Sequence, residues 1–313
     1  MEKALKTKRR DKNQKNDVNF SGLGKTIGRN FSAWLLLLPS VVLLFMVMWQ
    51  PIIKGIVLSF FHMKGYDAVG FAGFQNYKDV ISDTLFFETL KNTFSYVFWS
   101  LLIGIIPPII VAAMLNELKY AKSIFKFAIY FPSMVPVIAT ALVWYFLFQP
   151  GENGVLNMIM GQMGIPASQW LQNPNMTIPL ICLTMTWKGF GGTAILYLAS
   201  MQGINTELYE AATIDGSGIF RKFWHVTLPQ ISGVALLMLV RQIIAVFQVM
   251  VEPMAMTGGG PNNASITLSL QAYQYAFRNF QVDKSLALGV ITFLILMVLT
   301  VFYFKLKNKV EDN

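Results

Sequence analysis

Long apolar runs with few charged residues constrain this chain more than any other feature of its sequence. Four runs of about 20 residues contain no Lys, Arg, Asp or Glu, namely Ala33–Ile53, Thr93–Leu115, Phe127–Phe148 and Leu286–Phe304. Two further runs, Ile178–Met201 and Ile231–Met254, are interrupted only by Lys188 and by Arg241 and Glu252. A bilayer core needs about 20 mostly apolar residues as a helix. The sequence therefore predicts an all-α polytopic membrane protein with six transmembrane helices.

The composition agrees with a membrane protein. Charged residues make up only 13% of the chain, whereas a soluble domain carries about 25%. The net charge of +9 would suggest nucleic acid in a soluble protein. Here the basic residues lie at the N-terminus and in short loops, so we expect contact with membrane lipid and no nucleic acid. The single cysteine, Cys182, lies in an apolar run, where we expect an inert packed thiol.

The placement of Lys and Arg predicts the orientation. With the N-terminus inside, seventeen basic residues fall in cytoplasmic segments and four in outer segments, which satisfies the positive-inside rule. Three regions follow: a basic cytoplasmic arm over 1–32, a six-helix transmembrane domain over 33–304 and a cytoplasmic tail over 305–313. The arm is either a solvated topology signal or a binder of acidic lipid or a partner. The first run should remain as an anchor, because it lacks the features of a cleaved signal peptide.

Motifs for catalysis and nucleotide binding are missing from the sequence. It contains no G-x-x-x-x-G-K-[ST] loop, so we expect no ATP bound through a Walker site in this chain. The two histidines, His62 and His225, fall on opposite sides of the membrane in this topology and cannot form a shared metal or catalytic site. We therefore expect no catalytic residue, no metal and no cofactor in this chain.

The predicted cytoplasmic segment 207–230 is unusually apolar for a loop between spans. Its first part predicts a short helix that Gly216 and Gly218 can end. A second amphipathic piece runs through Ile219, Phe220, Phe223, Trp224 and Val226, and Pro229 opens the fifth span. Exposed apolar residues need a partner surface. From the residues alone, docking to another protein and lying flat on the membrane both stay open.

The same segment resembles the EAA loop of ABC importer permeases. That motif reads Glu-Ala-Ala, three residues, Gly, nine residues, an aliphatic residue, one residue, Leu-Pro; the matching positions are Glu210, Ala211, Ala212, Gly216, Val226, Leu228 and Pro229. The resemblance implies the type I ABC importer permease fold. It also implies that the EAA loop (residues 207–229) forms a coupling helix seated in an ATPase subunit. The residues expected to carry this contact are Glu210, Ala211, Ala212, Asp215, Gly216, Phe220, Leu228 and Pro229.

Further motifs resemble the carbohydrate-uptake branch of these permeases, in particular the larger maltose-transporter permease. An external T-x-G-G-P element matches Thr257, Gly259, Gly260 and Pro261, and is followed by Thr267, Leu270, Tyr273, Tyr275 and Phe277. Residues 71–77 (FAGFQNY) and 154–166 match two other outer elements. The resemblance extends from Ala33 to Phe304. The large external insert of the maltose protein is absent, because residues 59–90 are too few to form it.

The resemblance implies a complex in the cytoplasmic membrane of a bacterium. Its other members would be a second permease subunit with its own EAA loop, two ATPase subunits that bind ATP and Mg, and an extracellular solute-binding protein or lipoprotein. This chain would pass a sugar, most naturally an oligosaccharide, into the cytoplasm. A glycerol-phosphate type solute is the alternative cargo. A self-sufficient secondary transporter would need ion-coupling acids, of which only Glu252 is present, and a membrane-bound enzyme would need a catalytic cluster.

Charged and aromatic residues of the fourth and fifth spans are candidates for the transport pathway. A charge at mid-helix costs ~2.5–3.5 kcal/mol on insertion scales, so Lys188 and Arg241 should face water or the bundle interior. Along one helix, Glu252 would lie about 16 Å from Arg241, so we expect no pair between them. Sugar sites combine aromatic faces with polar groups. The candidates are Trp187, Lys188, Phe190, Tyr197, Arg241, Phe247, Gln248, Met250 and Glu252, each of which could instead pack in the core or face lipid.

Overall fold

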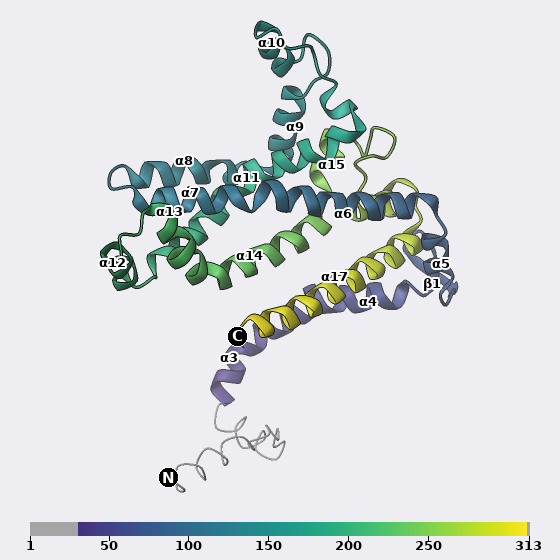
Figure 1. Cartoon of the computed structure of the whole chain (residues 1–313). Helices are drawn as coiled ribbons and strands as arrows, with labels where there is room; N and C mark the ends of the chain where they lie inside the picture. Colours follow the sequence, from purple (N-terminus) through teal and green to yellow (C-terminus); the bar gives the residue numbers. More distant parts are fainter. Residues whose placement is uncertain (1–30, 312–313) are drawn as a thin grey trace. The chain divides into compact units, whose positions relative to one another are not determined.

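A computed structural model describes residues 31–311, with side chains from residue 34 to residue 305. The predicted basic arm over 1–32 and tail over 305–313 lie almost wholly outside these described side chains. The chain divides into two compact units, Met1–Val57 and Leu58–Asn313, and each is considered by itself. The described part is mostly helical (Figure 1), which confirms the predicted class in its main feature.

The described part of the first unit is one helical run. Helix α3 (Phe31–Leu44) continues through a π-helical turn, η2 (Phe45–Trp49), into α4 (Gln50–Leu58). Pro51 lies directly after this turn, where the amide of Gln50 bonds to the carbonyl of Phe45. The run is mostly apolar, with Gln50 and Lys54 in α4, and residues Trp34–Leu58 are long and apolar enough to cross a membrane.

The second unit holds the other described elements. Its first half contains β1 (Phe61–Lys64), β2 (Asp67–Phe71), α5 (Gln75–Ile81), α6 (Thr84–Gly104), α7 (Ile106–Glu117), α8 (Lys122–Met134), α9 (Val137–Leu147) and α10 (Val155–Gln162). Its second half contains η3 (Trp170–Gln172), α11 (Pro174–Gln202), α12 (Thr206–Ile214), α13 (Ile219–Lys222), η4 (Phe223–Thr227), α14 (Leu228–Phe247), α15 (Val251–Met256), α16 (Leu268–Tyr273), η5 (Gln274–Arg278) and α17 (Val282–Glu311).

Four helical runs among the described residues are long and apolar enough to span a membrane. They are Trp34–Leu58, Thr84–Glu117, Ile219–Phe247 and Val282–Lys305, and the bent pair α8–α9 can make a fifth. Helix α11 has 29 residues, enough for a span by length, but its apolarity falls short of the other four. Four to five candidate spans are thus evident.

The predicted third span, Phe127–Phe148, is not one continuous helix. Helices α8 and α9 meet at a bend of 92° around Val135 and Pro136. Proline disfavours the helical conformation of the residue before it, and Val135 adopts ψ 134°. The sequence showed the proline, but a gentle kink and a full break look alike in an apolar run.

The predicted fifth span, Ile231–Met254, is also broken. Helix α14 ends at Phe247, and the short helix α15 begins only at Val251. The carbonyls released at this break accept hydrogen bonds from distant hydroxyls: Thr267 Oγ1 donates to Val249 O at 2.6 Å, and Ser269 Oγ donates to Phe247 O at 3.2 Å. The separation expected for Arg241 and Glu252 along one helix therefore does not apply.

A β-hairpin follows the first candidate span, where only helices were expected. Strands β1 and β2 pair antiparallel with Lys64 opposite Asp67, so Gly65 and Tyr66 form a two-residue turn. Gly65 supplies the φ of +64° that such turns favour. Asn76, from the FAGFQNY element, donates its side-chain amide to the carbonyls of Ser59 and Phe61 at 2.8 and 2.9 Å. This element therefore ties the hairpin to α5.

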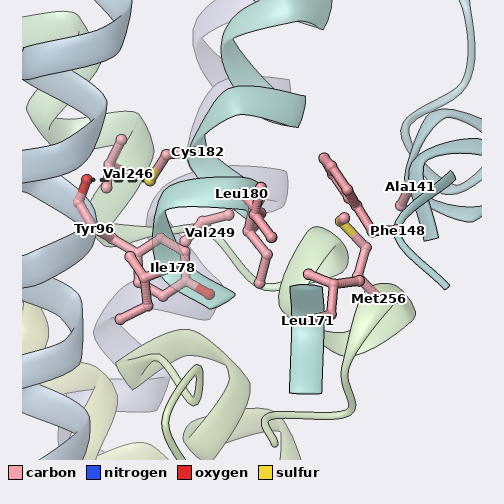
Figure 2. Close-up of a cluster of buried hydrophobic side chains, with 11 residues drawn as sticks. Tyr96, Ala141, Phe148, Leu171, Ile178, Leu180, Cys182, Val246, Val249 and Met256 are labelled. Atoms are coloured by element: carbon pink, nitrogen blue, oxygen red, sulfur yellow. Dashed lines mark hydrogen bonds between the residues drawn. The ribbon is translucent and has the colours of Figure 1, made fainter. Parts of the chain in front are cut away.

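The core between α6 and α11 shows how the helices contact one another (Figure 2). Tyr96 on α6 and Cys182 on α11 are fully buried, and Cys182 Sγ lies 3.6 Å from the Tyr96 carbonyl oxygen. Val246 of α14 and Val249 beyond its end pack into the same cluster. The thiol of Cys182 is therefore packed inside the protein, as expected.

The segment after α9 is held together by one buried asparagine. Asn157, which is 3% exposed, donates to the carbonyls of Gly151 and Ser168. Its Oδ1 accepts from Ser168 N at 2.9 Å and from Trp170 Nε1 at 2.7 Å. Because one side chain meets four partners, it fixes the path of the chain between α9 and α11.

We expect Asn157→Ala to destabilise this segment. The change leaves the buried donors of Ser168 and Trp170 without their acceptor, at about 1–3 kcal/mol for each unsatisfied group. The midpoint temperature of thermal unfolding, measured on the purified protein in detergent, should decrease. Gln162→Ala, at an exposed position of the same helix, is the matched control and should be neutral. Equal midpoints for the two variants would contradict this role of Asn157.

Candidate functional site

The helix of the EAA loop has well-defined ends. The Asn205 side chain caps α12 by accepting from Glu207 N at 3.1 Å. At the other end, Gly216 adopts φ +72°. Ser217 N donates to Ala212 O at 2.9 Å and Gly216 N donates to Thr213 O at 3.0 Å, which is the bond pair of a Schellman motif. The glycine of the EAA motif is thus the residue that ends this helix.

Side chains link α12 to the helix that follows it. The hydroxyls of Tyr209 and Thr227 lie 2.9 Å apart, and Lys222 Nζ donates to Thr213 Oγ1 at 2.8 Å. The second piece of the loop is not a separate helix, since α13, η4 and α14 form one run over Ile219–Phe247. In the π-helical turn η4, Leu228 N bonds to Phe223 O, and Pro229 follows in the first turn of α14.

The EAA loop exposes large apolar side chains. Ile214, Ile219, Phe220 and Trp224 are 87%, 79%, 84% and 61% exposed. Glu210, Ala211, Asp215 and Pro229 are exposed as well, whereas Ala212 and Leu228 are half-buried. Helices α12 and α13 lie at the same end of the second unit as the turn between α7 and α8 (Figure 1). The loop therefore offers an apolar surface on a braced helix pair.

A cavity of about 620 Å³ lies among α6, α7, α9, α11, α14 and α15, within the range of roughly 300–1,000 Å³ usual for small-molecule sites. Five of the nine candidate pathway residues line it: Lys188, Phe190, Tyr197, Arg241 and Glu252. The break after α14 brings Glu252 to this cavity. The cavity therefore combines two aromatic rings with three charged side chains.

Lys188 is held by the neighbouring helix. Its Nζ donates to Ser133 O at 3.2 Å, and Ser133 Oγ donates to Lys188 O at 2.9 Å. These reciprocal bonds connect α8 and α11. The carboxylate of Glu252 lines the same cavity. Lys188 thus makes a structural contact with α8 and lies at a cavity that also contains an acidic side chain.

The four other candidates do not line this cavity. Phe247 is fully buried and makes an edge contact with Phe94 at a centroid distance of 5.5 Å. Trp187 makes an edge contact with Trp144 at 5.8 Å. Gln248 lines a second hollow of about 450 Å³ between α14 and α17, and Met250 lies at the break before α15.

Several uncharged polar residues of the cavity were not predicted. Gln242 donates from Nε2 to Ser100 Oγ at 2.9 Å, and Thr186 Oγ1 is buried without a hydrogen-bond partner among the described residues. Thr193 and Ser232 also line the cavity. A search for polar residues inside apolar runs would have found Gln242, because glutamine is costly in lipid. Thr and Ser give no such signal, since they are ordinary in membrane helices.

The T-x-G-G-P element is bound mainly to its own loop and to α6. Thr257 Oγ1 donates to Pro253 O at 2.8 Å and lies 2.7 Å from Ser265 Oγ. Gly259 adopts φ +98°, and Ser265 Oγ donates to Gly260 O at 2.6 Å. From α6, Tyr96 OH donates to Ser265 O at 3.1 Å. In this chain the element fixes the backbone beyond α15.

Comparison with known proteins gives the family. Residues 104–311 match the family described as binding-protein-dependent transport system inner membrane component. The probable ABC transporter permease protein YurN of Bacillus subtilis is 30% identical over 277 residues, covering 87% of this chain and 94% of its own length. The lactose transport system permease protein LacF of Rhizobium radiobacter is 32% identical over 273 residues, covering 85% of this chain and 90% of its own.

A solved structure has the same fold. It is a bacterial ABC transporter involved in the import of the acidic polysaccharide alginate, with a TM-score of 0.79 at 23% identity. The match covers 92% of this chain and 98% of the other. Fold, sequence relatives and family match agree, and they confirm the resemblance seen in the motifs. The chain therefore belongs to the family of inner membrane components of binding-protein-dependent transport systems, which places it in the cytoplasmic membrane.

Proposed function

We propose that this chain is one of two permease subunits of an ATP-driven importer that carries a carbohydrate, most naturally an oligosaccharide, into a bacterial cytoplasm. The names of its relatives support this cargo, since they include transporters of arabinooligosaccharides, lactose and sulfoquinovosyl glycerol. In the proposed topology, the four candidate spans, the α8–α9 pair and α11 make six transmembrane segments, with both termini in the cytoplasm.

The exposed surface of the EAA loop is the observation that carries this proposal. Phe220 and Ile214 are more than four-fifths exposed at the end of a helix pair that is braced by its own hydrogen bonds. A rigid helix with exposed apolar anchors suits docking into a groove of another protein. The protein proposed to supply that groove is an ATPase subunit. The turn between α7 and α8, also predicted to be cytoplasmic, lies at the same end of the unit.

The proposed partners supply what this chain lacks. Two ATPase subunits would bind ATP and Mg, an extracellular solute-binding protein would deliver the cargo, and a second permease would complete the cavity. Closure of the ATPases would move the EAA loop. Because Lys222 and Tyr209 tie α12 to the Ile219–Phe247 run, that movement would pass into α14, which lines the cavity. The expected response is a rigid-body switch between two arrangements.

Replacement of one exposed anchor tests this proposal. We expect Phe220→Asp to reduce co-purification of the ATPase subunits at least tenfold, because a charge replaces an apolar anchor in the contact. Phe277→Asp is the matched control, since Phe277 is 57% exposed in η5, on the predicted outer side. Unchanged ATPase recovery with Phe220→Asp, or equal loss in both variants, would refute docking through the EAA loop.

A further inference from the structure

The charges that line the cavity are not balanced. Two cations, Lys188 and Arg241, and one anion, Glu252, are the charged residues among its described lining. Lys188 Nζ donates a hydrogen bond to the Ser133 carbonyl, and Glu252 offsets one of the two positive charges of the lining. The lining therefore carries one positive charge more than its negative charges, and Arg241 is the cation that makes no hydrogen bond to a described residue.

Arg241 has no counter-charge within the described part of the chain. Its side chain is exposed on α14, and no hydrogen bond or ion pair joins it to another described residue. The neighbours of Arg241 on the same helix face, Val240 and Ile244, are apolar. Arg241 lies in a predicted membrane span, where a guanidinium needs a polar or anionic partner.

From this imbalance we propose that the carbohydrate taken into the cavity carries an anionic oxygen group and that Arg241 binds it. The inference rests on the proposed import of carbohydrate. The planar guanidinium donates paired hydrogen bonds that match carboxylate or phosphate geometry. The rest of the cavity suits a sugar, because its lining includes the aromatic residues Phe190 and Tyr197 and the hydroxyl-bearing residues Thr193 and Ser232.

A carboxylate of the second permease is the competing partner for Arg241. In that case Arg241 would stabilise the assembly and would not select the cargo. The two cases differ in a measurable way, because a specificity residue changes the ratio of affinities for charged and neutral sugars. A structural ion pair changes both affinities together, or changes assembly.

The test uses matched sugars and the assembled complex of permeases and ATPases in lipid nanodiscs. Binding of lactose and lactobionate, of trigalacturonate and its methyl ester, and of glycerol 3-phosphate is measured by calorimetry. We expect the wild-type complex to bind the acid of at least one sugar pair at least tenfold more tightly than its neutral counterpart. Arg241→Gln should abolish that ratio while leaving neutral binding unchanged, and Arg241→Lys should retain part of it. Arg278→Gln, an exposed arginine of η5 away from the cavity lining, should retain all of it.

Each other outcome has a defined meaning. If the complex binds glycerol 3-phosphate more tightly than both sugar acids, the group bound by Arg241 is a phosphate, and the proposal of an acidic sugar is overturned. Equal or tighter binding of neutral sugars, no binding of either acid, or loss of the second permease from Arg241→Gln would overturn the inference. If a neutral oligosaccharide alone stimulates ATP hydrolysis, import of carbohydrate stands and only the anionic cargo fails. If no ATPase co-purifies with the wild-type chain, the proposed function fails first.

Discussion

Gly191→Ala is expected to separate α8 from α11 and to be among the most damaging single changes in this chain. A Cβ at position 191 would lie 2.0 Å from the carbonyl oxygen of Ile129 and 2.7 Å from its carbon. These are backbone atoms of a packed helix, so no side-chain rotation can relieve the clash. Overpacking of this kind costs typically 1–3 kcal/mol and occasionally more, and we expect a value of about 3 kcal/mol or above.

The damage should extend beyond stability. The α8–α11 contact also contains the reciprocal bonds of Ser133 and Lys188, so separation of the helices would disturb a charged residue of the cavity. Thermal unfolding in detergent measures the first effect, and substrate-stimulated ATP hydrolysis of the assembled complex measures the second. We expect a clear fall in both quantities.

Gly289→Ala is the matched control for Gly191→Ala. A Cβ at position 289 in α17 meets nothing within 4 Å, and alanine favours a helix over glycine by about 0.5–1 kcal/mol. This variant should be neutral or slightly stabilised. If both alanine variants behave alike, the close approach of α8 and α11 is not required for the fold.

Gly216→Pro is expected to abolish substrate-stimulated ATP hydrolysis while membrane insertion continues. Proline fixes φ near −65° and has no amide proton, whereas Gly216 adopts φ +72° and donates to Thr213 O. Both halves of the Schellman motif are therefore lost. Helix α12 would no longer end at Ile214, and the apolar surface around Ile214 and Phe220 would change its direction.

Hydrolysis is measured on the reconstituted complex, and insertion by the yield of protein in the membrane fraction. Gly218→Ala is the control two positions away, because Gly218 has φ −71° and open space around its Cβ. This variant should keep nearly full coupling. Glu210→Lys is a second variant expected to uncouple hydrolysis, since Glu210 is exposed on the same helix. Wild-type coupling in both Gly216→Pro and Glu210→Lys would refute a coupling role for this loop.

The predicted and observed helices agree best where the signal is local. Thr93–Leu115 and Leu286–Phe304 lie inside the longer runs Thr84–Glu117 and Val282–Lys305. Apolar periodicity and caps depend on neighbours within a few residues, so they can be followed in the sequence. The β-hairpin after Leu58 was missed because its strands are only four and five residues long and the second is exposed along its whole length.

The candidate site was predicted less completely than the fold. Residue type predicted Lys188 and Tyr197 correctly, since both line the cavity. Phe247 is aromatic like Tyr197, but it lies in the core. Composition and spacing give the set of residues able to contact a sugar. They do not give the direction of each side chain, because that depends on which neighbouring helix covers it.

The sequence by itself determined the membrane class, the family and the position of the EAA loop, because apolar runs and motif spacing are properties of adjacent residues. Only the tertiary structure decided where the spans break and what the breaks bring together. The carbonyl of Val249 accepts a hydrogen bond from Thr267, 18 residues away, and no local sequence pattern predicts such a partner. That break brings Glu252 to the cavity that Lys188 and Arg241 also line. Its physical reason is that a backbone group freed in an apolar core must find its bond elsewhere in the fold.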